Sequence, residues 1–437
     1  MLRRTSFKTQ LSKGRFAIAA SFIIFVIVIA SLLLPDLFSV KYDSKKNIVL
    51  GDFVVASTTI EAVPVVAPIT HVKTPASVKA IYMTSWVAGT NSIRDNVVNI
   101  IDTTEVNAVV IDIKDYTGNI AFKTGDAALD GLGCTENRIR DIQDFIGTLH
   151  TKGVYVIGRV AVFQDPCYVK LHPEAAVKRS SDGGIWKDRK GISWMDAGSK
   201  LIWDHAVDIA RASYDIGFDE INFDYIRFPS DGNMKDIAFP ASGSRAKDLV
   251  IGDFFRYLDK ELRGGKAASS SDPVFDELYA SYTSTSTNKS FFGGSDGRSD
   301  NAGNGRMVVS ADLFGLVTVA EDDLGIGQTL AQTLPYVDYI YPMVYPSHFA
   351  AGWNNFKNPA DHPYDVVKIS MSRAAERTRA QGLNIQKLRP WLQDFDLGAT
   401  YTAEMVRAQI QATYDAGLTS WLMWDPSNKY TVPAFKK

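Results

Sequence analysis

Short apolar runs alternate with amphipathic segments from residue 78 to the end of the chain. The runs have the length of single strands and cover residues 78–86, 108–115, 154–163, 220–229, 306–315, 337–346, 387–395 and 420–426. Segments with helical spacing lie between most of them, including 137–152, 199–216, 244–263, 364–381 and 402–416. This alternation predicts an α/β fold, a closed (β/α)₈ TIM barrel. An open doubly wound sheet is the alternative, but the glycine-rich turn it favours does not follow the first run.

The N-terminal region has a different pattern. Residues 16–34 carry no charge, and the residues before them include five basic side chains and no acidic one. A stretch of this length nearly matches the ~20 residues that cross a bilayer, and the basic flank is expected to stay in the cytoplasm. We therefore predict a cytoplasmic tail (1–15) and a transmembrane signal anchor (16–34). A cleaved signal peptide and a buried core helix are the alternatives.

Two further segments interrupt the barrel pattern. Residues 35–76 are rich in Val, Thr, Ala and Pro and predict a stalk. The barrel domain is expected over 77–437, with a flexible insertion at 264–305, rich in Gly, Ser, Thr and Asn, before the fifth strand. With the anchor, this predicts a single-pass protein of the cell membrane whose barrel is extracytoplasmic. Cys134 and Cys167 could pair there, or remain free thiols.

Composition and charge narrow the function. The chain is 46% hydrophobic and 22% charged, which is typical of a globular protein. A net charge of −2 gives no basic surface, so we expect no nucleic-acid partner. The two cysteines and six histidines lack the spacing of metal ligands, and there is no phosphate loop or G-x-S-x-G motif. We therefore expect neither a metal site nor a cofactor.

Acidic residues follow the alternation of the strands. Because side chains alternate between the two faces of a strand, Asp112 with Lys114, Asp224 and Asp312 are expected to point into the barrel. Active sites of such barrels lie at the carboxyl ends of the strands. Burying several acids without partners is unfavourable, so a converging group indicates acid/base chemistry. A structural ion-pair network is the alternative.

Aromatic and polar residues near the same strand ends suit a sugar-binding surface, because flat rings flanked by polar groups match sugar faces. For any single ring, packing in the barrel is the alternative. The candidates for substrate binding are Trp86, Tyr341, Tyr345, His348, Trp391, Gln393 and Trp424.

Several long motifs resemble the bacterial putative glycoside hydrolase domain family, a (β/α)₈ group. They are VKAIYMTSWVAGT, VVIDIKDYTG, GFDEINFDYIRFPSDG, VSADLFG, VDYIYPMVYPSHF, RPWLQDF and WLMWDPSNKY. The resemblance covers residues 77–430. It implies a glycoside hydrolase, without defining the sugar.

Two better-known groups are distantly similar. In the α-amylase-like clan a nucleophilic Asp ends the fourth strand and an acid Glu ends the fifth; Asp224 and Asp312 occupy these positions. The clan's Arg two residues before the nucleophile is replaced by Asn222, and Arg227 lies three residues after it. Family-18 chitinases also resemble the chain, but Ile226 stands where their acid Glu is found. Their substrate-assisted mechanism is therefore not expected.

These observations lead to one hypothesis: a membrane-anchored, extracytoplasmic glycoside hydrolase of a cell-surface or extracellular polysaccharide. Asp224 would be the nucleophile or stabilising carboxylate, and Asp312 the general acid/base; retention and inversion remain open. The supporting residues would be Asp112, Lys114, Arg159, Arg227 and, although its parity is unfavourable, Asp394. A non-catalytic glycan-binding barrel is the alternative, and a metal-dependent deacetylase a weaker one.

Overall fold

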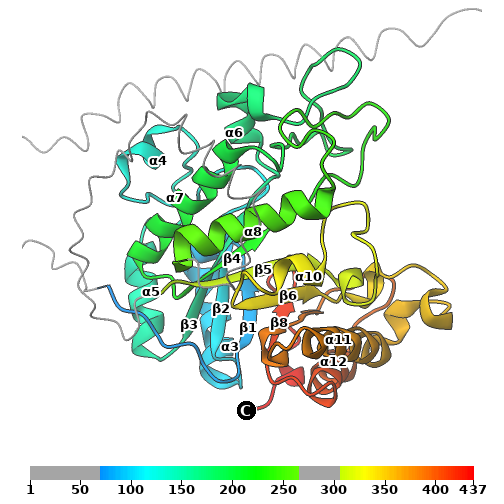
Figure 1. The fold of residues 1–437 in the computed structure, drawn as a ribbon. Coiled ribbons are helices and arrows are strands. Elements are labelled where there is room, and N and C mark those ends of the chain that lie inside the picture. Colours follow the sequence, from blue (N-terminus) through cyan, green and yellow to red (C-terminus); the bar gives the residue numbers. More distant parts are fainter. Residues whose placement is uncertain (1–68, 265–305) are drawn as a thin grey trace, which may run out of the picture. The chain divides into compact units, whose positions relative to one another are not determined.

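The computed structural model describes residues 69–264 and 306–437, and within them eight parallel strands form a closed barrel in sequence order (Figure 1). This confirms the predicted TIM barrel. Each predicted run contains one strand, although the strands are shorter than the runs. They are β1 (Lys79–Met83), β2 (Ala108–Lys114), β3 (Tyr155–Ala161), β4 (Glu220–Asp224), β5 (Val308–Phe314), β6 (Tyr339–Met343), β7 (Trp391–Gln393) and β8 (Trp421–Trp424).

Helices connect successive strands around the outside of the barrel (Figure 1). The longer ones are α3 (Asn91–Thr103), α5 (Ile142–Thr151), α7 (Lys200–Ile216), α8 (Lys247–Arg263), α11 (Pro363–Ala380) and α12 (Ala403–Asp415). The short ones are α2 (Ser85–Ala88), α4 (Ala127–Gly131), α6 (Pro166–Leu171) and α10 (Leu330–Thr333). Short 3₁₀ turns span Pro173–Ala175, Gly315–Thr318, Pro346–His348, Trp353–Asn355, Pro359–Asp361, Ile385–Lys387 and Val432–Ala434. The five helical segments named from the sequence are all helical, and α3 adds a sixth long helix.

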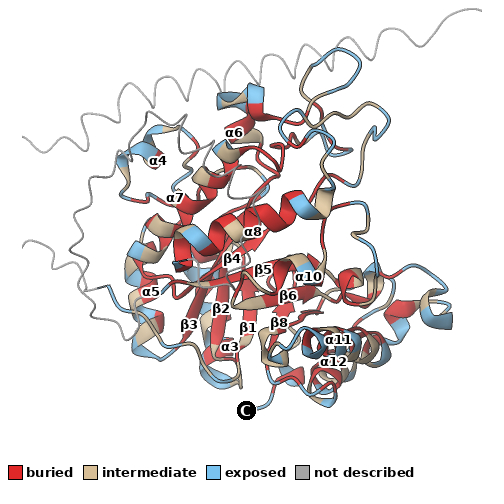
Figure 2. Ribbon diagram, viewed as in Figure 1, coloured by how far each residue is buried: buried red, intermediate tan, exposed pale blue. Residues whose placement is uncertain are grey.

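The strands are buried on both faces (Figure 2). In β2, Val109 and Ile111 belong to the large apolar cluster between strands and helices, whereas Ala108 and Val110 belong to a smaller cluster inside the barrel. The alternation expected from the sequence therefore separates two cores. The inner core is the one that continues toward the carboxyl ends of the strands.

The amino-terminal end of the barrel is filled by a polar layer. Glu220 is fully buried and accepts hydrogen bonds from Tyr155 Oη at 2.9 Å and from Tyr341 Oη. Arg389 Nη1 lies 3.1 Å from Glu220 Oε2 and 3.1 Å from Tyr341 Oη. Both oxygens of Glu220 are therefore paired, whereas Arg389 Nε is buried without a hydrogen-bond partner, and these side chains fill the amino-terminal end of the barrel.

Residues 70–74 are attached to this lower end, before the predicted domain boundary at residue 77. Val72 N–H donates to Asp219 Oδ1 at 2.6 Å, and the ring of His71 stacks on Tyr214 with centroids 4.1 Å apart. Thr74 Oγ1 lies 3.0 Å from Tyr155 Oη. The segment that precedes β1 is thus part of the packed barrel.

Two further predictions concern the pairing of the two cysteines and the segments outside the barrel. Cys134 and Cys167 form a disulfide, with Cα atoms 5.9 Å apart, which resolves the open question of their pairing. The predicted tail, anchor, most of the stalk and nearly all of the insertion lie outside the described residues. Between residues 69 and 264 and from 306 onward, no helix is long and apolar enough to cross a membrane.

The contacts of residues 70–74 predict the effect of a truncation. A fragment covering 77–437 lacks the Val72 donor and the His71 ring, so Asp219 loses a buried hydrogen bond. Compared with a fragment covering 69–437, we expect it to lose about 1–3 kcal/mol of unfolding free energy. Urea unfolding of both fragments measures the difference, and equal midpoints would show that the segment adds no stability.

Candidate active site

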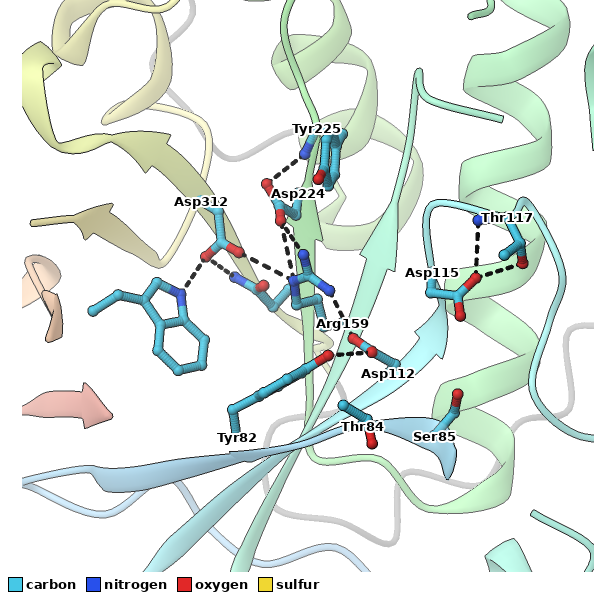
Figure 3. A network of polar contacts seen from close by, with 12 residues as sticks. Tyr82, Thr84, Ser85, Asp112, Asp115, Thr117, Arg159, Asp224, Tyr225 and Asp312 are labelled. Carbon is cyan, nitrogen blue, oxygen red and sulfur yellow. Dashed lines mark hydrogen bonds and ion pairs between the residues drawn. The ribbon is translucent and has the colours of Figure 1, made fainter. Parts of the chain in front are cut away.

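The guanidinium of Arg159, on β3, lies between three carboxyl groups inside the barrel (Figure 3). Its Nη1 donates to Asp112 Oδ1 at 2.7 Å. Its Nε donates to Asp224 Oδ2 at 3.1 Å and lies 3.6 Å from Asp312 Oδ2. All four side chains are at least nine-tenths buried. The predicted convergence of the three acids is therefore confirmed, and Arg159 is its centre.

Asp224 ends β4 at a sharp change of chain direction. The next residue, Tyr225, has a φ of 54°, which is uncommon for a residue other than glycine. Its backbone N–H donates to Asp224 Oδ1 at 2.5 Å, while Arg159 binds Oδ2. Both oxygens of the carboxylate are thus held in place. Such backbone conformations cluster at functional sites, where they position side chains.

Asp312, on the neighbouring strand β5, is held by side chains of β7 and β4. Its Oδ1 accepts hydrogen bonds from Trp391 Nε1 at 2.8 Å and from Asn222 Nδ2 at 3.1 Å. Its Oδ2 faces Arg159 and has no hydrogen-bond donor at short range among the described residues. The two oxygens therefore differ: Oδ1 is an acceptor for two N–H groups, and Oδ2 is the oxygen that can carry a proton.

Asp112 connects the acid cluster to the first strand through Tyr82, and Tyr82 in turn contacts the last strand. Tyr82 Oη, on β1, donates to Asp112 Oδ2 at 2.5 Å. The Tyr82 ring stacks on Trp424 of β8 with centroids 3.9 Å apart, and the Arg159 guanidinium lies 5.1 Å from the Trp424 centroid. These contacts order one wall of the barrel mouth.

The carboxyl groups do not share one electrostatic environment. Burial raises the pKa of Asp312 well above its usual range, the nearby charge of Asp224 adds to this, and Arg159 only partly opposes it. Burial also raises the pKa of Asp112, against the opposing effect of Arg159. One cation is too few for three buried acids, so part of the group is held in its protonated form. Two acids with different environments are what acid/base catalysis requires.

Lys114 does not join this group, so its predicted convergence with the acids is wrong. The register of β2 on β3 shifts between Asp112 and Lys114, and this β-bulge changes the direction of the Lys114 side chain. Its Nζ lies 2.5 Å from Asp165 Oδ2, and both residues are almost fully buried. Lys114 is therefore one half of a separate ion pair beside α6.

Arg227 and Asp394 form no hydrogen bond with the three acids, although Arg227 lies within electrostatic range of Asp224. The Arg227 guanidinium lies 4.9 Å from the ring centroids of both Trp194 and Phe314, and its Nη1 donates to Phe228 O and Ser230 Oγ. Asp394 Oδ2 accepts a hydrogen bond from the backbone N–H of Thr431 at 2.8 Å. The unfavourable parity of Asp394 is thus consistent with its position.

The predicted substrate-binding residues divide into accessible and enclosed groups. Trp86 and His348 are exposed, Trp424 is half-buried, and Tyr345 is buried beside His348, near the charges of Asp312 and Asp224. Three candidates are completely enclosed: Tyr341, Trp391 and Gln393. Tyr341 belongs to the lower polar layer, Trp391 positions Asp312, and Gln393 accepts hydrogen bonds from Ser347.

Sequence reasoning assigned no role to Tyr82 or to the side chain of Asn222. Alternation along the first strand places Tyr82 on the same face as Ala80, and this signal could have identified it. The described residues contain no group of three or more His, Cys, Asp or Glu side chains that could hold a metal ion.

Removing the central cation should destabilise the barrel in a pH-dependent way. In Arg159→Met, three buried acids lose their counter-charge, and we expect a loss of about 3–5 kcal/mol near pH 7. Near pH 4 Asp312 and Asp112, whose pKa values burial raises, are more fully protonated, so the loss should be smaller. Arg159→Lys keeps the positive charge but not the several N–H groups of the guanidinium, so its loss of unfolding free energy should be intermediate. Urea unfolding at both pH values measures this, and equal losses would assign Arg159 a packing role instead.

Asp394 predicts a second pH effect. Burial raises its pKa to about 6, against the hydrogen bonds of Thr431. The stability from this group is fully present below the ordinary pKa of about 3.9 and is lost as the pH rises through 6. Asp394→Asn should therefore stabilise the protein at pH 7 relative to pH 4, by up to about 3 kcal/mol. Denaturant unfolding of both proteins at the two pH values tests this; a constant difference would contradict it.

Solved structures similar to this chain include proteins from several bacteria. A hypothetical protein from Ruminiclostridium thermocellum is 33% identical over 42% of this chain and 93% of its own, with a TM-score of 0.39. The α-L-fucosidase isoenzyme 2 of Paenibacillus thiaminolyticus is 11% identical over 82% of this chain and 48% of its own, with a TM-score of 0.49. The α-galactosidase of Thermus thermophilus is 11% identical over 82% and 60%, with a TM-score of 0.44. This chain thus spans about half of the fucosidase.

No curated protein matches the sequence. A family model described as "Putative glycosyl hydrolase domain" matches residues 80–291 and 299–430, which include the eight strands except the first residue of β1, and the three acids of the cluster. The match covers most of the chain and confirms the resemblance carried by the strand motifs. The chain therefore belongs to this glycosyl hydrolase domain family.

Proposed function

We propose that the protein hydrolyses a polysaccharide with retention of configuration, using Asp224 as the nucleophile and Asp312 as the general acid/base. The observation that carries the proposal is that both carboxyl groups lie against the same atom, Arg159 Nε. They come from adjacent strands, β4 and β5, at the end of the barrel where such enzymes act.

The shared contact limits the separation of the two acids. Asp224 Oδ2 lies 3.1 Å and Asp312 Oδ2 3.6 Å from Arg159 Nε, so these oxygens cannot be further apart than the two distances combined. That limit includes the ~5–5.5 Å typical of retaining enzymes and only the short end of the ~6.5–9.5 Å typical of inverting ones. Inversion needs space for a water between the carboxylate that acts as general base and the anomeric carbon, so the geometry favours retention.

The environments of the acids assign their roles. A general acid must hold a proton at the working pH, and the raised pKa of Asp312 keeps one on this group. Because Oδ1 already accepts two N–H groups, the proton belongs on Oδ2, the oxygen facing Arg159 and Asp224. Asp224 is fixed by Arg159 and the Tyr225 N–H, as a group that attacks along one direction should be.

The reaction would proceed in two steps. Asp312 gives its proton to the glycosidic oxygen while the Asp224 carboxylate attacks the anomeric carbon, so that the leaving sugar departs as an alcohol and a glycosyl ester forms. Asp312, now ionised, then removes a proton from water, and the resulting hydroxide displaces Asp224. The carboxylate and the acid return to their initial states, and one water has been consumed.

Other residues would support these steps. Arg159 orients both acids, Tyr82 and Asp112 fix Arg159, and Trp424 lies beside them at the mouth. The sequence features of residues 16–34 support an anchored, extracytoplasmic enzyme whose substrate is a cell-surface or extracellular polysaccharide. The proposed partners are therefore this polysaccharide and, through the N-terminal segment, the membrane.

A non-catalytic glycan-binding barrel is the second candidate. The observation in its favour is the burial of Asp312, which is only 1% exposed and whose Oδ1 is fully bonded. On this view the acids are a structural network, and glycan binding depends on the aromatic residues alone. The two functions differ in what happens when one acid is replaced.

Activity of acid variants separates them. We would incubate the full chain with a panel of bacterial surface polysaccharides and measure released reducing ends, comparing wild type with Asp224→Asn and Asp312→Asn. We expect each variant to lose about 10²–10⁴-fold in rate, because each removes one group that acts in the transition state. Asp365→Asn, an exposed acid on α11, is the matched control and should keep full activity.

Three outcomes decide the question. Release lost in both acid variants, with the first product retaining its anomeric configuration by NMR, supports the proposal. Release that persists in Asp224→Asn shows an enzyme with a different site. Glycan binding without release, unaffected by either substitution, favours the binding module.

A further inference from the structure

A second site lies beside the acid cluster. An open pocket of about 550 Å³ is lined by residues of the segments that follow β1 and β2, among them Trp86, Asn91, Glu136, Asn137, Arg138 and Asp141. None of these residues contacts Asp224 or Asp312. The pocket is therefore separate from the residues proposed to carry the chemistry.

Trp86 is the unusual feature of this pocket. It is 60% exposed, although large aromatic side chains usually find cover. The guanidinium of Arg138 lies 4.4 Å from the ring centroid and covers one face. The remaining surface of the ring is left open to solvent.

Arg138 makes this ring a rigid platform. Its side chain is only 4% exposed, and Nη1 donates to Asp115 Oδ2 at 2.6 Å and to Ser85 Oγ at 3.0 Å. The other end of the fork binds Glu136. A guanidinium held by this many partners cannot easily move away from the ring. The indole is therefore supported from one side and needs little further ordering when a ligand stacks on the other.

The charges of the pocket indicate a neutral ligand. Two acids, Glu136 and Asp141, balance the two arginines that line it, Arg138 and Arg140. Glu136 pairs with Arg138, and Asp141 pairs with Arg94 at 2.9 Å. A cation stacking on the open face of Trp86 would be repelled by the positive charge of Arg138 on the other face of the ring. The apolar face of a neutral sugar has no such conflict, and the two asparagine amides can bond its hydroxyls.

The pocket lies next to the mouth of the barrel in the chain, because its residues follow the first two strands. Ser85 and Asp115, which hold Arg138, follow the strands β1 and β2 that carry Tyr82 and Asp112, and the charge of Asp115 acts on Asp112 (Figure 3). A chain bound across the acid cluster can therefore extend over this rim.

We propose that Trp86, supported by Arg138, is a distal subsite that stacks a neutral pyranose unit of the polysaccharide, away from the bond that is cleaved. This assignment rests on the proposed function. It adds the class of sugar bound at one position. The unit that stacks on Trp86 is neutral, and a sugar with a free amino group is excluded there.

The test uses the full chain carrying Asp224→Asn, so that probes are not consumed, in affinity electrophoresis. The gels contain neutral galactomannan, mixed-linkage β-glucan, or glycol chitin, and cationic glycol chitosan is the comparison for glycol chitin. We expect retardation in a neutral gel, and an added Trp86→Ala should weaken the apparent affinity by about tenfold. Trp86→Phe, which keeps a ring, should retain most of the affinity. Leu249→Ala, an exposed apolar residue on α8, is the matched control and should change nothing.

Each other outcome overturns the proposal in a defined way. If Trp86→Ala leaves the retardation unchanged, Trp86 is not a sugar-binding subsite. If glycol chitosan retards the protein more strongly than glycol chitin does, the sugar bound at Trp86 is not restricted to neutral units. No retardation in any gel also rejects it. None of these results depends on whether Asp224→Asn abolishes hydrolysis, so the subsite can fail while the catalytic proposal stands. With active enzyme, Trp86→Ala should raise KM for a polysaccharide and leave kcat unchanged.

Discussion

The ion pairs of Arg159 with three buried acids are the interaction on which the upper half of the barrel depends. A charge inside a closed barrel has no access to bulk water, so the acids must be compensated within a few ångströms. A planar guanidinium can do this because its nitrogens point in several directions at once, which a lysine ammonium on the same strand could not match. The remaining deficit of positive charge keeps protons on part of the group. The chemistry proposed for Asp312 thus arises from the same imbalance that makes Arg159 indispensable.

The barrel and the inward direction of the acids could be predicted because both depend on simple periodicities. A parallel strand buried on two faces leaves an apolar run, and the alternation along that run identifies the inner face. Asp112, Asp224 and Asp312 were placed correctly by this reasoning. The position of Asp394 on the other face was also indicated by its parity. These results depend only on the direction of each side chain, which is a local property of the strand.

The failures concern properties that are not local. Lys114 has the parity of an inward-facing residue, but the bulge next to it changes the direction of its side chain. That bulge depends on how β2 pairs with β3, which the sequence of β2 alone does not determine. Tyr341 was expected near the carboxyl ends of the strands, yet it lies in the polar layer at the amino-terminal end with Glu220. Depth along the barrel axis depends on the stagger between strands, which alternation does not encode. Tyr82 was overlooked although its strand showed the necessary pattern.

Tyr82 has a consequence for how the protein matures. It stacks on Trp424 of the last strand and binds Asp112 of the second, so it lies across the seam where the sheet closes on itself. The acids and their immediate partners come from six of the eight strands. A nascent chain, or one with its final β/α unit detached, would hold the acids without the geometry that relates them. On the proposed mechanism, the acids would therefore reach their catalytic arrangement only when the barrel closes.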